Sequence, residues 1–138
     1  MKQRFEHLTV TTAGRSFTDI TDNARKFVVR AQIDLGLLTL FIQHTSASLL
    51  IQENADPDVL RDLEDAFARF APRDASYRHT TEGSDDMPAH IRAALTQSSL
   101  SIPVESGAPV LGTWQAIYLF EHRDAPHHRT IVMHAIGE

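Results

Sequence analysis

Apolar and polar residues alternate along several short segments of the chain, which is the pattern of half-buried β-strands. Residues 3–12 and 114–121 alternate in this way, and residues 37–43 form an almost continuous apolar run that predicts a central strand. Further short strands are expected at residues 49–51, 99–104 and 130–136. The last two predicted strands are close in sequence, so we expect them to form an antiparallel pair.

Three other segments repeat apolar residues every three or four positions, which is the pattern of an amphipathic helix. The first predicted helix covers residues 19–32. The second begins at Asp56-Pro57-Asp58, where an aspartate can cap the helix and proline suits its first turn. The third begins at Asp86, which we expect to act as its N-cap, and should turn Leu95 inward.

These elements predict an α+β fold with a mostly antiparallel sheet system and about three helices. The 138 residues fit a single domain, residues 1–138. A net charge of −5 argues against nucleic acid as a partner, and the absence of cysteine excludes disulfides and thiolate metal sites. Because no segment resembles a signal peptide or a membrane span, we expect a cytoplasmic protein with no membrane partner.

The segment from Gly83 to His90 is the strongest candidate for chemistry. Asp86 and His90 stand four residues apart, so one helical face would carry both. Together with Asp85 and His79 they can gather around a divalent cation or a phosphorylated substrate. The alternative is a helix cap beside a solvent-exposed histidine.

Two further groups of polar residues suit an oxyanion. His44, Thr45 and Ser46 follow the central apolar strand, and Asn54 precedes a helix N-terminus, where anions bind readily. Near the C-terminus, Glu121-His122-Arg123 and Arg129 can bring guanidinium groups to a phosphate. Each group also has a purely structural interpretation, as a hydrogen-bonded turn or a surface ion pair.

Taken together, these segments resemble the YjbQ-like family, whose members are often described as secondary thiamine-phosphate synthases. The likeness covers nearly the whole chain in the right order, with one departure at Ala116, where the family commonly has glycine. The matching segments are His44–Ala47, Glu53–Asp58, Tyr77–His79, Glu82–His90, Ser99–Val104, Leu111–Gln115 and Glu121–Arg123.

The resemblance implies a mostly antiparallel β-sandwich with about three flanking helices, assembled as a homotrimer. It also implies a thiamine-phosphate synthase-type transferase, which joins a pyrimidine pyrophosphate to a thiazole phosphate and releases pyrophosphate. The residues expected to be catalytic are His44, Asp86 and His90. Those expected to bind the phosphorylated small-molecule substrate are Thr45, Ser46, Asn54, Asp85, Glu121 and Arg123.

The expected cofactor is a divalent metal, either Mg²⁺ held by Asp85 and Asp86 or Zn²⁺ held by His44, His79 and His90. Two alternatives to the transferase stay open. One is a metal-dependent hydrolase that uses the same histidine–carboxylate cluster on a phosphorylated small molecule. The other is a non-catalytic trimeric module that binds a phosphorylated metabolite.

Overall fold

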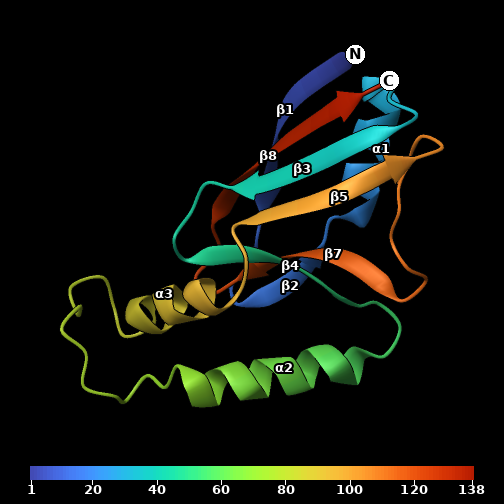
Figure 1. The fold of residues 1–138 in the computed structure, drawn as a ribbon. Helices are drawn as coiled ribbons and strands as arrows, with labels where there is room; N and C mark the ends of the chain where they lie inside the picture. Colours follow the sequence, from blue (N-terminus) through green and yellow to red (C-terminus); the bar gives the residue numbers. More distant parts are fainter.

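Two antiparallel β-sheets of unequal size form the framework of the molecule (Figure 1). The structure is a computed structural model that describes residues 1–138. Its elements in chain order are β1 (Lys2–Thr11), β2 (Ser16–Asp19), α1 (Thr21–Ala31), β3 (Gly36–Ile42), β4 (Ala47–Glu53), α2 (Pro57–Phe70), α3 (Asp86–Leu95), β5 (Ser99–Glu105), β6 (Ala108–Pro109), β7 (Gln115–Glu121) and β8 (His128–Gly137). The predicted α+β fold with mostly antiparallel sheets and three helices is therefore confirmed.

Each sheet is assembled from strands that are distant in the sequence. The larger sheet has the order β1-β8-β3-β5-β6, and the smaller has the order β2-β7-β4. The predicted pairing of the last two strands is wrong, because β8 pairs with β1 and β3 while β7 pairs with β2 and β4. The short strand β2 was not predicted, and only its last residue, Asp19, falls within the segment that we assigned to the first helix.

The hydrophobic core lies between the two sheets, and α1 contributes to it. Alternate residues of β3, such as Leu38 and Leu40, point inward and are fully buried. From the small sheet, Ile117 and Leu119 meet them, and Phe27 of α1 joins the same cluster. Burying each such side chain stabilises the fold by about 1.5–3 kcal/mol.

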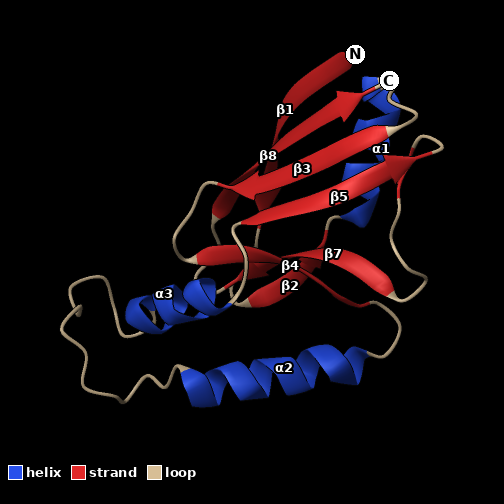
Figure 2. Ribbon diagram, in the orientation of Figure 1, coloured by secondary structure: helices blue, strands red, loops and turns tan.

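The other two helices lie against the side of the small sheet that faces away from the large sheet (Figure 2). Phe120 of β7 stacks on Phe17 of β2 at 4.0 Å between ring centroids, and Phe67 of α2 meets its edge at 5.5 Å. Strand β7 is thus buried on both faces, by the core on one side and by Phe67 of α2 on the other. In contrast, α2 has no fully buried residue and is tied down by ion pairs from Glu64 to Arg92 and Arg15.

Helix α3 buries a different face from the one we predicted. Its buried residues include Asp86, Ala89 and Arg92, whereas Leu95 is 56% exposed. The predicted cap is also wrong, because the N-cap residue is Asp85 and neither carboxylate makes a side-chain capping bond. Asp86 is instead the first residue of the helix, and its side chain is engaged elsewhere.

Candidate metal centre

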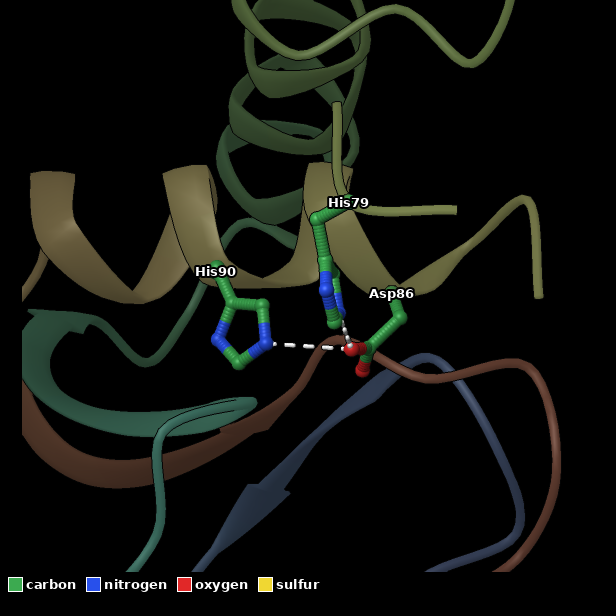
Figure 3. Close-up of side chains that lie close together, drawn as sticks. All are labelled: His79, Asp86 and His90. Carbon is green, nitrogen blue, oxygen red and sulfur yellow. Dashed lines mark hydrogen bonds and ion pairs between the residues drawn. The ribbon is translucent and has the colours of Figure 1, made fainter. Parts of the chain in front are cut away.

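Three side chains, His79, Asp86 and His90, converge beside the start of α3 (Figure 3). Their potential ligand atoms all lie within 4.8 Å of one another. His79 Nε2 lies 2.6 Å and His90 Nε2 lies 3.0 Å from the same atom, Asp86 Oδ2. Asp86 is 5% exposed, while the side chains of His79 and His90 are 39% and 32% exposed, so the centre is open on one side.

Helical periodicity explains two of the three positions. Asp86 and His90 are one turn apart on α3, so their side chains extend from the same face. His79 comes from the loop between α2 and α3, and its ring contacts that of His90 edge to face at 5.4 Å between centroids. All three residues therefore belong to the segment of chain that connects β4 to β5.

Both ring nitrogens of His90 face hydrogen-bond acceptors. Nδ1 lies 2.9 Å from the backbone carbonyl of Thr45, which can only accept, so Nδ1 carries the donated proton. A neutral imidazole then presents a bare Nε2 to Asp86 Oδ2, and two lone pairs would repel each other. The arrangement is satisfied when a proton or a metal cation lies between Nε2 and the carboxylate.

Arg123 supports the carboxylate of Asp86 from the opposite side. Its Nη1 lies 2.8 Å from Asp86 Oδ1, the oxygen that the histidines leave free. Burial raises the pKa of Asp86, but the hydrogen bond from His79 and the charges of His90 and Arg123 outweigh it and leave the pKa below its usual value. Asp86 is therefore held as an anion, the form that binds a cation.

The remaining donors of Arg123 are also occupied. Nε donates to Asp85 Oδ2 at 2.9 Å, and Nη2 donates to the carbonyl of Glu82 at 2.9 Å. Although burial raises the pKa of Asp85, the bonds from Arg123 and the Asp124 amide lower it to about 2. Asp85 and Arg123, which we expected to bind substrate, thus bind each other beside the centre.

Glu121 lies in a second, buried cluster rather than on a surface that a substrate could reach. The residue is fully buried and accepts hydrogen bonds from Thr12 Oγ1 at 2.7 Å and Arg129 Nε at 2.8 Å. Arg129 Nη2 also donates to Glu121 and to Ser46 Oγ. Burial raises the pKa of Glu121, but these donors lower it below its usual value. Glu121 is therefore the anionic partner of a buried guanidinium.

The two predicted site residues His44 and Asn54 also lie outside the three-residue cluster. The ring of His44 accepts a hydrogen bond at Nε2 from the Thr130 amide and is not among the converging ligand atoms. Asn54 follows β4 and Thr45 precedes it, so the two residues lie at opposite ends of a strand that is about 20 Å long. The Asn54 side chain donates to the Thr113 carbonyl.

Residues that the sequence did not indicate complete the surroundings of the centre. The carbonyl of Thr45 orients His90, but a main-chain group has no signature in the side-chain pattern. Thr12 had no motif around it, yet its hydroxyl bonds to the buried Glu121. Ser46, predicted as a substrate ligand, holds Arg129 through both its carbonyl and its hydroxyl.

The donor set can be tested against the expected metals. Two imidazole nitrogens and one carboxylate oxygen, with an open side, are the ligands of catalytic zinc sites. Magnesium prefers oxygen ligands, and the second carboxylate that it would need, Asp85, is paired with Arg123. The residues present therefore fit zinc or a similar transition metal.

Two cavities share residues with the centre or with its immediate surroundings. One of about 220 Å³ is lined by His79, Tyr77 and Arg73, among others. Another of about 610 Å³ is lined by residues 41–46 together with Ser98 and Arg129. Because Thr45 lines the second cavity and contacts His90, that cavity adjoins the centre.

None of the three helices is long and apolar enough to cross a lipid bilayer.

Comparison with known proteins gives one consistent result. The sequence model described as UPF0047 protein YjbQ-like matches residues 6–138. A UPF0047 protein of Synechocystis sp. is 50% identical over 138 residues, covering 99% of this chain and 94% of the relative. The UPF0047 protein YjbQ of Escherichia coli O157:H7 is 42% identical over 132 residues, covering 95% of this chain and 96% of the relative.

Solved structures agree with the sequence relatives. A YbjQ-like protein of unknown function from Sulfolobus solfataricus P2 superposes with a TM-score of 0.92 at 28% identity, covering 99% of both chains. A conserved protein of the YjbQ/UPF0047 family from Clostridium acetobutylicum superposes with a TM-score of 0.88 at 37% identity, covering 95% of this chain and 99% of that one.

Proposed function

This chain belongs to the YjbQ-like UPF0047 family, and we propose that it is a metal-dependent enzyme acting on a phosphorylated small molecule. The convergence of His79, Asp86 and His90, with two acceptors facing the His90 ring, carries this proposal. A divalent cation bound there would supply a Lewis acid that stabilises negative charge on a phosphoryl oxygen.

The residues of the chain have separate tasks in this proposal. Thr45 holds the His90 ring through its carbonyl and keeps Nε2 directed at the centre. Arg123 keeps Asp86 ionised and fixes its carboxylate plane. Hydrolysis is the reaction that we infer first, because a centre of two imidazoles and one carboxylate with an open side is typical of metallohydrolases.

The thiamine-phosphate synthase-type transfer is the second candidate. A transferase needs space for two substrates, whereas a hydrolase needs space for one. The two cavities, one lined by His79 and the other by Thr45, favour this second reaction. The transfer would place the pyrimidine pyrophosphate in one cavity and the thiazole phosphate in the other.

We also propose that the chain assembles as a homotrimer through the outer face of the large sheet. Phe5 of β1 and Phe41 of β3 lie on this face and are 60% and 45% exposed. Leu37 of β3 extends the same exposed apolar surface. Contact with other copies of the chain would bury aromatic rings that a single chain leaves in water.

An activity screen tests the proposed reactions. Protein stripped with a chelator is reloaded with Zn²⁺, and phosphate release is measured on a panel of phosphomonoesters. Pyrophosphate release from a pyrimidine pyrophosphate is measured with and without the thiazole phosphate. We expect turnover that depends on Zn²⁺ and falls at least about 100-fold in His90→Ala and Asp86→Asn.

The control is His128→Ala, which removes an exposed histidine outside the cluster and should leave turnover unchanged. Pyrophosphate release that requires both substrates would favour the transferase over the hydrolase. Tight binding of a phosphorylated compound without turnover would favour the non-catalytic module instead. Wild-type rates in His90→Ala would remove that residue from the mechanism.

A further inference from the structure

One buried guanidinium edge has no proper acceptor. Arg129 is 4% exposed, and its Nε and Nη2 donate to Glu121 and Ser46. The only hydrogen-bond contact of Nη1 within the chain is with His44 Nδ1, at 3.3 Å. A buried donor without an acceptor destabilises the folded protein. It is therefore important whether His44 Nδ1 accepts a hydrogen bond from Arg129 Nη1 or is itself a donor.

The backbone fixes the tautomer of His44. The Thr130 amide can only donate, and it lies 2.8 Å from His44 Nε2, so Nε2 is the bare nitrogen. The ring is neutral, because burial and the charge of Arg129 lower the pKa of His44. Its one proton is therefore on Nδ1. The contact at 3.3 Å then brings two donors together, Nδ1–H and Nη1–H, with no acceptor for either.

Both donors belong to residues that line the cavity of about 610 Å³. Thr45 and Ser46 line the same cavity, and their backbone amides donate to no acceptor within the chain. The Thr45 hydroxyl likewise makes no side-chain hydrogen bond within the chain, so this wall carries several donors that lack acceptors.

We propose that this wall is a phosphate-binding subsite in which an oxyanion accepts hydrogen bonds from Arg129 Nη1 and His44 Nδ1 together. Several oxygens on one tetrahedral group match several donors better than the two oxygens of a carboxylate do. Since Glu121 offsets the charge of Arg129, the subsite holds phosphate by directed hydrogen bonds, and free phosphate should bind weakly.

The subsite also has a place in the proposed reaction. Thr45 lines the cavity and its carbonyl contacts His90, so a molecule anchored here would extend toward the metal centre. This assignment to substrate binding rests on the proposed function, whereas binding of phosphate itself does not. The anchoring group would be a phosphate at a distance from the reacting bond, which selects for substrates that carry a separate phosphoryl group.

Nuclear magnetic resonance of metal-free protein with ¹⁵N-labelled histidine tests the subsite. The ring nitrogens of His44 should show the Nδ1–H tautomer, and inorganic phosphate should shift them in a saturable way. His44→Phe should weaken phosphate binding at least about tenfold. The matched control His128→Phe, at an exposed histidine on β8, should leave binding unchanged.

The possible outcomes separate the subsite from the enzyme. An Nε2–H tautomer, or phosphate that shifts the His44 ring no more than the other histidines, would overturn the subsite. Equal phosphate affinity in His44→Phe would overturn it as well. Because the experiment uses no metal and no turnover, a protein that binds phosphate at His44 but shows no activity would retain the subsite while the proposed function fails.

Discussion

Replacing Glu121 by glutamine is the sharpest test of the buried cluster. The change keeps the shape of the side chain but removes its charge, which leaves Arg129 uncompensated at 4% exposure. Glu121 accepts from two atoms of Arg129, from Thr12 and from two backbone amides. Removing one partner of such a pair costs about 3–5 kcal/mol, which is a large part of the stability of an ordinary domain.

Urea unfolding at fixed protein concentration measures this effect. We expect the midpoint to fall with little change in slope, because the same surface is exposed on unfolding. The control is Arg61→Gln, which removes an ion pair with Asp58 whose side chains are 74% and 70% exposed. That change should cost less than about 0.5 kcal/mol.

A loss below about 1 kcal/mol in Glu121→Gln would refute the assignment of Glu121 as the essential partner of a buried charge. If the variant were fully stable but bound substrate poorly, the role expected from the sequence, contact with substrate, would be correct instead. The two results are separable because unfolding is measured without substrate.

Arg123→Gln should weaken Zn²⁺ binding about 10- to 100-fold without removing a ligand, because Asp86 loses the guanidinium at 2.8 Å. Titration calorimetry measures the Zn²⁺ affinity, and an unchanged affinity would contradict the role of Arg123 in supporting Asp86. Phe41→Asp should lower the mass seen by light scattering from three times that of the 15.4 kDa chain to a single chain, and an intact trimer would exclude this face as the interface. Burial and the charge of Arg92 lower the pKa of His122 to about 3, so between pH 6.5 and 3 the unfolded chain binds a proton that the folded chain does not. Stability should therefore fall by about 1.4 kcal/mol per pH unit as the pH drops through this window. His122→Gln should flatten that slope, and equal slopes in both proteins would assign the pH dependence to other groups.

The sequence pattern predicted most of the elements but not all of their partners. Periodicity is local, so it located β3 and α2 within a residue or two. Pairing depends on which apolar faces meet across the core. Residues 116–120 of β7 are all apolar, and Phe120 and Leu119 are buried on its opposite faces, so the one-faced alternation that we predicted was not the right interpretation of this strand. The apolar run is consistent with burial on both faces, but nothing in the segment shows that α2 is the element that covers the second face.

For the candidate site too, local spacing was predictable from the sequence and long-range contacts were not. The four-residue spacing of Asp86 and His90 was sufficient to place both side chains on one helical face. Whether Arg123 meets a phosphate or a carboxylate depends on a contact with Asp85, which is 38 residues away in the chain. The residue types indicated which side chains could bind a phosphate. Only the folded structure shows that the guanidinium nitrogens of Arg123 already donate to Asp85, Asp86 and Glu82.

The three converging side chains lie within residues 79–90, and this makes the centre nearly local in sequence. Drawing His79 and His90 together closes only a short loop, which costs little entropy compared with bringing distant strands into contact. The segment from α2 to α3 includes a helix, α2, that buries no residue fully. An ion bound at the centre would stabilise this segment more than it stabilises the two sheets. This segment and the ion would therefore order each other, while the core between the two sheets contains none of the three ligand residues and would depend on the ion less directly.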